Sequence, residues 1–279
     1  MLEGHLSLAE IERLRGCLWR TDPDRQIRDE QGALRLIREL GFLLLMPIAG
    51  AELPSIHRAT RDDWSWWDWK QTLPGRKACY YAKVLRHRGT FISWPWFSRF
   101  RAALGDRRSY HQLYREGLLD RAEKQLLDLL AEHGPMMTGE LRLAFGPRSK
   151  QNTRRVKSIL VGLQRRFLIT TAGGDTEGWS HHRWDLVERW VRADLLAEAD
   201  RIARSTAREQ LLVKCVQNVV ATTPADVAWL FGWERPEVEA MVGKLTAAGK
   251  LGRAVAPELE GEVIVPNPWP GKGRGRRAR

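Results

Sequence analysis

The sequence predicts an α+β protein that is mainly helical, with tandem winged-helix modules after an N-terminal helical, tryptophan-rich region. Two segments, residues 119–192 and 206–266, each predict three helices followed by two strands, which is the order of elements in a winged helix. The first 118 residues differ from both segments, because four tryptophans fall between residues 64 and 69. A chain of 279 residues is long enough for one large domain or for two to three small ones.

The N-terminal region, residues 1–118, is predicted to combine helices with short strands. A capping box of Ser7 and Glu10 opens the first helix. Gly41 ends the second helix, and Pro47 ends the apolar strand that follows it. The expected elements are helices over residues 8–19 and 30–40, a strand over 42–46, a helix over 80–88, a strand over 90–93 and a helix over 96–104.

The first winged-helix module is predicted over residues 119–192. Gly134 ends its first helix, and Ser149 caps its third helix. The consecutive glycines 173 and 174 place the hairpin turn between its two strands. The expected elements are helices over residues 120–132, 138–145 and 149–167, a strand over 168–171, a turn over 172–175 and a strand over 183–187.

The second winged-helix module, residues 206–266, repeats this order without clear sequence identity between the copies. A helix within residues 193–205 is expected to link the modules. The tail over residues 267–279 is rich in Gly and Arg and is expected to be disordered, as a solubilising end or a phosphate-binding arm. The expected elements are helices over residues 206–220, from 223 onward and over 235–248, and strands over 253–256 and 262–265.

Composition points to a polyanionic partner. The chain carries 46 Lys and Arg against 34 Asp and Glu, a net charge of +12, which favours DNA ahead of RNA or an anionic membrane. The longest apolar run, near residues 42–49, is too short to span a bilayer, and the N-terminus lacks a signal-peptide pattern. We therefore expect a cytoplasmic, nucleoid-associated protein. Cys17, Cys79 and Cys215 are far apart without a CxxC pair, so neither a disulfide framework nor a structural zinc site is expected.

A basic helix is the strongest local signal. Residues 147–167 contain seven Lys or Arg and no Asp or Glu, while Val156, Ile159 and Leu163 supply one apolar face. A helix that packs by one side and presents cations and amides on the other suits the major groove of duplex DNA. A solvated helix face is the alternative. The residues predicted to contact DNA are Lys83, Arg86, Arg148, Lys150, Gln151, Arg154, Arg155, Lys157, His181, His182 and Arg183.

The third helix of the second module has the opposite charge pattern. It contains Glu234, Glu237 and Glu239 against Arg235 and Lys244. Acidic side chains repel the DNA backbone, so this helix is a poor candidate for reading DNA. We expect it to pack within the protein or to face a protein partner.

The aromatic residues of the N-terminal region are a second signal. Aromatic faces between cations suit stacking on a base taken out of the duplex. Packing in the core is the alternative, since most tryptophans lie there. Adjacent Trp66 and Trp67 cannot both point inward from one element, so at least one is expected at a surface or cleft. The residues predicted to bind a base are Trp66, Trp67, Trp69, Tyr80 and Tyr81.

Carboxylates near these aromatics are the catalytic candidates. Breaking the bond between a base and deoxyribose builds positive charge on the sugar, and a carboxylate can stabilise that charge and orient a water. Glu52 and Asp68 lie close in sequence to the aromatic cluster. A surface or structural role is the alternative for each of them.

Several short segments resemble the AlkZ/YcaQ-like superfamily of winged-helix DNA glycosylases, in particular a shorter AlkZ-related branch. Residues 40–47 are similar to the catalytic segment of that superfamily, where characterised enzymes carry Gln-x-Gln or Gln-x-Asp to position the attacking water. Leu44 and Met46 occupy the matching positions here, and neither can hydrogen-bond a water. Further segments that resemble the branch are Glu52-Leu53-Pro54, Trp67-Asp68-Trp69-Lys70, Leu73-Pro74, Tyr80-Tyr81-Ala82-Lys83 and Leu85-Arg86.

The resemblance implies an enzyme that flips a base out of duplex DNA and hydrolyses its N-glycosidic bond without a cofactor. A bulky alkylated base is the substrate that the resemblance implies, in DNA repair. The tryptophans themselves suggest an alternative, a glycosylated, hypermodified phage base in phage defence, because their flat apolar faces also suit the C–H faces of a sugar. With Gln-x-Asp/Gln absent, Glu52 or Asp68 would supply the carboxylate, or Lys70 or Lys83 would attack the sugar as a neutral amine. The alternatives are a non-catalytic winged-helix DNA-binding protein or regulator, and an interaction protein that uses the acidic second module.

Overall fold

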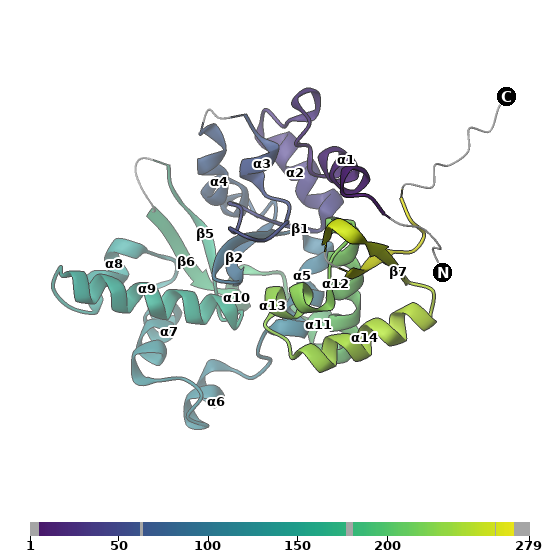
Figure 1. Ribbon diagram of the computed structural model, residues 1–279. Helices are drawn as coiled ribbons and strands as arrows, with labels where there is room; N and C mark the ends of the chain where they lie inside the picture. The colour runs from purple at the N-terminus through teal and green to yellow at the C-terminus, as the bar shows by residue number, and fades with distance from the viewer. Residues whose placement is uncertain (1–5, 62–63, 177–180, 260, 271–279) are drawn as a thin grey trace.

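The computed structural model describes residues 6–61, 64–176, 181–259 and 261–270. The protein is α+β and mainly helical, as predicted, and its described residues form three small antiparallel sheets. Figure 1 shows the N-terminal region beside the C-terminal hairpin, with the middle module extending away from both. None of the described helices is long and apolar enough to cross a membrane. The tail predicted to be disordered lies mostly outside the described residues.

The N-terminal region is built around a sheet with strand order β1-β3-β2. Ser7 caps α1 by accepting a hydrogen bond from the backbone N–H of Glu10. The predicted capping box is only half formed, because the Glu10 carboxylate instead accepts a hydrogen bond from Nε1 of Trp269 at 3.3 Å. The elements are α1 (Leu8–Trp19), η1 (Pro23–Arg25), α2 (Glu30–Leu40), β1 (Phe42–Leu44), α3 (Ile56–Ala59), η2 (Ser65–Asp68), α4 (Trp69–Gly75), β2 (Tyr80–Leu85), β3 (Arg88–Ile92), α5 (Trp94–Leu104) and α6 (Tyr110–Arg115).

The helix predicted over residues 80–88 is wrong, since this segment is strand β2 and the start of a β-hairpin. Tyr81 pairs with Phe91 of β3 across the hairpin. Arg86 and His87 form the turn with φ of 45° and 60°, a left-handed conformation usually given to Gly or Asn. Neither residue signals a turn in the sequence, so the β-branched and aromatic content of the strands was the clue to follow.

Gly41 fixes the junction between α2 and β1. Its φ is +76°, and a Cβ there would lie 2.6 Å from Cδ1 of the Trp96 ring. We expect Gly41→Ala to lower the free energy of unfolding by about 2–4 kcal/mol, from left-handed strain together with overpacking. Gly243→Ala in α14 (Arg235–Ala247) is the matched control, because a Cβ there meets no atom within 4 Å. The control should gain about 0.5–1 kcal/mol from helix propensity. Equal urea midpoints for the two variants would contradict this account of Gly41.

The middle module has the element order of a winged helix, with a short strand between its first two helices. Asp120 and Glu123 form a capping box at the start of α7, and Ser149 caps α9 as predicted. The sheet order is β4-β6-β5. The elements are α7 (Arg121–His133), β4 (Met136–Met137), α8 (Thr138–Ala144), α9 (Lys150–Arg165), β5 (Ile169–Asp175), β6 (His181–Leu186) and α10 (Val187–Trp190).

The turn predicted over residues 172–175 is wrong, because these residues continue strand β5. The register of β5 against β6 shifts between Thr171 and Gly174. Gly173 has φ of +109°, and a Cβ there would lie 3.1 Å from the Cα of Gly75 in α4. The glycine therefore serves a bulge and a close approach of two backbones rather than a hairpin turn.

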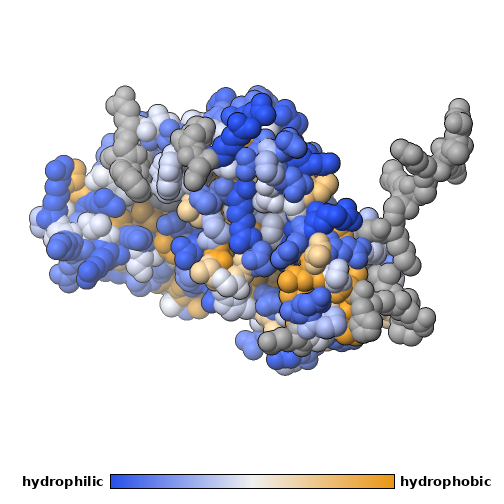
Figure 2. Space-filling view, turned by 45° about the horizontal axis from the view of Figure 1, so that its top comes forward, coloured by the Kyte–Doolittle hydropathy of each residue, from blue (hydrophilic) through white to orange (hydrophobic). Residues whose placement is uncertain are grey.

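The C-terminal module shares its core with the N-terminal region. Phe231 packs against Phe42 and Phe100, at ring-centre distances of 6.4 Å each. The predicted linker helix is α11, and it packs on α5, where Ser98 Oγ donates to the backbone carbonyl of Leu195. Most exposed side chains seen in Figure 2 are hydrophilic, in keeping with this burial. The elements are α11 (Ala193–Arg201), α12 (Arg204–Val219), α13 (Pro224–Phe231), α14, β7 (Leu251–Ala256), η3 (Pro257–Leu259) and β8 (Gly261–Pro266).

Candidate functional site

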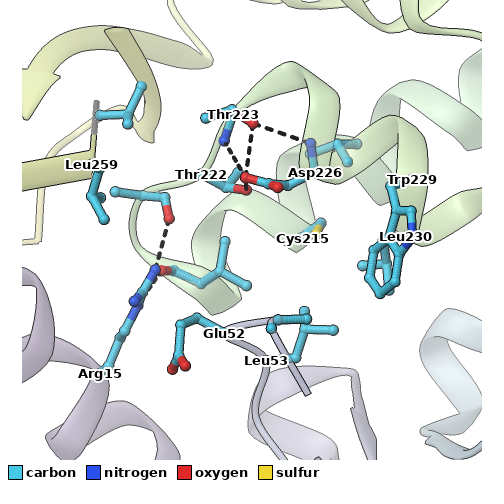
Figure 3. Close-up of a pocket in the computed structure, with 16 residues that line it drawn as sticks. Arg15, Glu52, Leu53, Cys215, Thr222, Thr223, Asp226, Trp229, Leu230 and Leu259 are labelled. Carbon is cyan, nitrogen blue, oxygen red and sulfur yellow. Dashed lines mark hydrogen bonds between the residues drawn. The ribbon is translucent and has the colours of Figure 1, made fainter. Parts of the chain in front are cut away.

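A pocket forms where the N-terminal region meets the C-terminal module. Its volume is about 420 Å³, within the ~300–1,000 Å³ of sites for small organic groups. Arg15 of α1 and residues 50–53 line it from the N-terminal side, and residues 221–223, Asp226 and Trp229 line it from the C-terminal side. Figure 3 shows Arg15 at one end of this pocket and Trp229 at the other.

Glu52 is the predicted catalytic carboxylate that this pocket contains. Its two oxygens accept hydrogen bonds from Nη1 and Nη2 of Arg58 at 2.8 and 3.3 Å. These bonds lower the pKa of Glu52, burial opposes the change, and the charges of Arg58 and Arg15 add to the lowering. The side chain is nevertheless 57% exposed. Glu52 is therefore an ionised carboxylate that a ligand in the pocket can reach.

Arg15 places a buried cation beside Glu52. Its Nε and Nη2 donate to the backbone carbonyls of Val219 and Ala221, both at 2.9 Å. Its guanidinium also lies 5.3 Å from the ring centre of Trp19. Burial lowers the pKa of Arg15, while the nearby charge of Glu52 raises it. These contacts fix the guanidinium at the wall that α1 and α12 share.

A second hollow of about 740 Å³ adjoins the pocket, and Arg15 and Glu52 line both. Trp19, His57 and Arg58 contribute to the second hollow. The Arg58 guanidinium lies 5.9 Å from the Trp19 ring centre, and Nδ1 of His57 is buried without a hydrogen-bond partner among the described residues. Glu52 thus stands at the boundary between a deeper pocket and a hollow with cationic walls.

The pocket carries net negative charge in a strongly basic protein. Asp226 opens α13 through a capping box, in which Oδ2 accepts hydrogen bonds from the N–H and Oγ1 of Thr223. The charged side chains among the described residues of the lining are Arg15, Glu52 and Asp226. One cation and two carboxylates therefore face this pocket, whereas the whole chain carries +12.

A second arginine, Arg86, lies at the other end of the pocket. Its guanidinium lies over the indole of Trp229, 4.7 Å from the ring centre. Arg86 belongs to the turn between β2 and β3, so the hairpin reaches α13 at the edge of the pocket. This contact brings a residue predicted to bind DNA next to Glu52's pocket.

The predicted basic helix is α9, and its cations are exposed. Val156, Ile159 and Leu163 are buried against the module core. Within the part of the chain that the structure describes, none of the cations predicted to contact DNA from this segment forms an ion pair. The exposed polar residues here are Arg148, Lys150, Gln151, Arg154, Arg155 and Lys157.

Helix α14, the third helix of the C-terminal module, contrasts with α9. Its Arg235 pairs with Glu239 at 2.8 Å, and its Lys244 pairs with Glu209 of α12 at 2.5 Å. Cations that already have acidic partners attract phosphate less than free ones do. The two helices therefore offer different surfaces. In the described part of the chain, the cations of α9 are free of acidic partners, whereas those of α14 are paired with glutamates.

The basic surface of α9 continues onto the β2–β3 hairpin. The backbone N–H of Lys83 donates to Oε1 of Gln164 at 2.9 Å, which ties β2 to α9. Burial lowers the pKa of Lys83, and the positive charge of Lys157 lowers it further. Burial likewise lowers the pKa of His87, followed by the charge of Arg165. Neighbouring positive charges that repel one another in this way form a surface that a bound anion stabilises.

The comparisons with known proteins agree with the resemblance seen in the sequence. The sequence model of the AlkZ-related family matches residues 27–232. The chain belongs to this family. Its fold is similar to that of the Streptomyces sahachiroi DNA glycosylase AlkZ, with a TM-score of 0.61 at 12% sequence identity, over 95% of this chain and 71% of that chain. No curated protein matches the sequence.

In this AlkZ-related chain, the two positions that match the glutamine motif of the resembling enzymes hold apolar side chains with little exposure. Leu44 lies in the shared core, and Met46 is half-buried against the N-terminal core. Leu44 forms a parallel bridge with Ser55, and its N–H donates to the carbonyl of Pro54 at 3.0 Å. The segment that carries Glu52 therefore runs directly beside the strand that carries this motif in the superfamily.

Most of the aromatics predicted to bind a base pack in the core. Trp66, Trp69, Tyr80 and Tyr81 are buried, and Trp67 is half-buried. Their assignment to a base pocket needs correction, because rings in the core present no free face. Tyr80, for example, stacks on Phe167 at 5.5 Å. The expectation that at least one of Trp66 and Trp67 lies at a surface or cleft stays a prediction, since Trp67 packs, partly buried, against the core that contains Trp66.

Lys70 has the chemistry of an amine nucleophile but not the access. Burial lowers its pKa to about 8, and the charge of Asp68 acts in the opposite direction. Its Nζ donates to the carbonyl of Trp67 at 2.9 Å and lies 3.8 Å from the centre of that ring. The residue is 2% exposed. Lys70 lies with Asp68 at α4, and neither residue lines the pocket of Glu52.

The wing residues predicted to contact DNA differ in exposure. Arg183 is exposed and lines a shallow hollow beside Gly173 and Gly174. His182 is half-buried, with its ring centre 6.1 Å from that of Tyr81. The side chain of His181 lies outside the described part. The described residues contain no cluster of three His, Cys, Asp or Glu that could hold a metal ion.

His182 should couple stability to pH. Burial lowers its pKa to about 3, and the charges of Lys70 and Lys83 add to the lowering. Between that value and about 6.5 the unfolded chain binds the extra proton, so this histidine makes stability fall as pH drops below about 6.5. We expect His182→Gln to lose less free energy of unfolding than wild type between pH 7 and pH 5. Parallel losses in the two proteins would contradict this role.

Proposed function

We propose that the protein is a DNA glycosylase that acts on duplex DNA. The basic surface of α9 and the β2–β3 hairpin would hold the phosphate backbone, and the pocket at Glu52 would receive one flipped nucleotide. The observation that carries the proposal is the continuity of this surface with the pocket, through the contact of Arg86 with Trp229. The family membership and the fold similarity support the same class of reaction.

Glu52 suits the electrostatic part of such a reaction. In the proposed hydrolysis the C1′–N bond breaks and its electron pair leaves with the base. Water adds to C1′, and its proton passes to the departing base or to solvent. The sugar carries positive charge while that bond breaks, and an ionised carboxylate stabilises it. The hydrogen bonds from Arg58 keep Glu52 ionised but weaken it as a base. Its main role is therefore to stabilise the sugar and orient water.

The charge of the pocket bears on the substrate. Alkylation of a purine ring nitrogen gives the base a positive charge, which the carboxylates of Glu52 and Asp226 would attract. A bulky alkylated base is therefore our first substrate class, and a hypermodified phage base, neutral and bulky, is the second. Repair corresponds to the first substrate and phage defence to the second. Either role places the protein on DNA in the cytoplasm, at the nucleoid.

The test is base release from duplexes that carry either an alkylated or a hypermodified base. Wild-type protein should convert one of these duplexes to an abasic product, detected as strand cleavage after alkali, without an added metal or cofactor. Unmodified duplex of the same sequence is the control for contaminating nucleases. A blank result over both lesion classes, despite salt-sensitive duplex binding, would remove the glycosylase proposal.

A non-catalytic DNA-binding protein is the second candidate. The apolar Leu44 and Met46, in place of the hydrogen-bonding motif of the superfamily, favour it directly. This candidate predicts tight duplex binding with no product from any lesion. The compensated surface of α14 would then remain available to a protein partner, in line with the charges expected for that helix.

A further inference from the structure

Trp229 places an exposed aromatic ring at the pocket, whereas the aromatics that the sequence predicts to bind a base are mostly buried. Trp229 of α13 is 40% exposed and lines the pocket with Glu52. The neighbouring aromatics of its module, Phe231 and Trp233, are buried and stack on each other at 4.4 Å. Trp229 is thus the tryptophan of this pocket whose ring is not enclosed in the core.

A cation of the β2–β3 hairpin lies over this ring. The planar guanidinium of Arg86 lies 4.7 Å from the ring centre of Trp229. Among the described residues, Arg86 has no hydrogen bond or ion pair with an acid that would hold it elsewhere. Its φ of 45° and that of His87, 60°, place two non-glycine residues in a left-handed turn. The hairpin therefore accepts backbone strain where it presents this cation to the indole.

We propose that Trp229 is the stacking platform for the flipped base, and that Arg86 occupies this platform until DNA binds. A guanidinium and a nucleobase are both planar and both stack on indole. A phosphate offers Arg86 a charge-assisted bond that is stronger than its exposed contact with a ring. Binding of the backbone would therefore draw Arg86 away and free the ring for the base. This inference rests on the proposed use of the pocket for a nucleotide.

The geometry links two steps that would otherwise be independent. Lys83 places a second cation near Arg86, since the charges of both residues add to the lowering of the pKa of His87 that burial and Arg165 cause, so a phosphate that reaches the hairpin meets two cations. The same approach brings a nucleotide to the edge of the pocket that holds Glu52. The exchange of guanidinium for base would couple docking on α9 to filling of the pocket.

The experiment measures how much better the full chain binds a duplex with one mismatched pair than the same duplex fully paired. A mismatch lowers the cost of flipping, so the affinity ratio reports capture of the flipped base. We expect Trp229→Ala to lower this ratio about tenfold and Trp229→Phe to keep most of it. Arg86→Ala should raise the ratio about threefold, because no cation must leave the ring, while it weakens binding to both duplexes.

Trp64→Ala is the matched control, since Trp64 is 54% exposed and lines neither the pocket of Glu52 nor the hollow that adjoins it. It should leave the ratio unchanged. An unchanged ratio in a folded Trp229→Ala variant, or no mismatch preference in wild type, overturns the inference. A blank base-release assay with a ratio that depends on Trp229 removes the glycosylase and keeps the platform. Base release together with a ratio that Trp229→Ala leaves unchanged keeps the glycosylase and removes the platform.

Discussion

Base release should fall by about 100- to 1000-fold in the Glu52→Gln variant, while affinity for duplex DNA changes little. The substitution keeps the shape of the side chain and removes the charge that would stabilise the sugar as the C1′–N bond breaks. Loss of one well-placed electrostatic contact typically has an effect of this size. The ion pair with Arg58 is half-exposed, so its loss should change stability by only about 0–1 kcal/mol. Single-turnover release with a modified duplex measures the effect.

Two further variants make this result specific. Glu132→Gln removes an exposed carboxylate of α7 that lies away from the pocket, and it should release the base at the wild-type rate. Asp68→Asn tests the rival carboxylate beside Lys70 at α4. Loss of release in Asp68→Asn, with normal release in Glu52→Gln, would move the reaction to α4 and would refute the assignment of the pocket.

Much of the helical architecture could be predicted because helix ends leave local signals. Ser149, Asp120 and Thr223 cap their helices as side-chain acceptors, and Gly41 ends α2 with positive φ. The β2–β3 hairpin escaped prediction because its turn uses Arg86 and His87, where a sequence rule expects Asn-Gly. The role of Gly173 also has no local signal, because its backbone approaches that of Gly75, almost a hundred residues earlier in the chain.

The candidate site was only partly predictable, because burial depends on the whole fold. Proximity to aromatics in the sequence points to Glu52, yet its partners in space are Arg58 and Arg15. Arg15 and Trp229 were both missed. Arg15 lies on α1 and Trp229 on α13, and only the fold brings both to Glu52, at the pocket where the N-terminal region meets the C-terminal module. The local signal for Arg15 is its place on the face of α1 that carries Ile11 and Trp19, one turn to either side.

The largest effect on binding should come from removing the exposed cations of α9. Lys150, Arg154 and Lys157 are spaced by four and then three residues, so they lie on one face of the helix. We expect their joint replacement by Ala to lower the slope of log affinity against log salt by about 2–3 units and to weaken duplex binding at low salt by at least about tenfold. Stability should change little, because all three side chains are exposed.

A matched triple variant separates this effect from net charge. Arg235, Lys244 and Arg253 are cations of the C-terminal module, and each already pairs with a glutamate. Replacing all three by Ala also lowers the charge by three, yet it frees carboxylates rather than removing free cations, so the salt slope should change by less than about one unit. Equal changes of slope in the two triples would mean that DNA responds to the overall field of a basic chain. That result would contradict the proposal that DNA docks on α9 before it reaches the hairpin and the pocket.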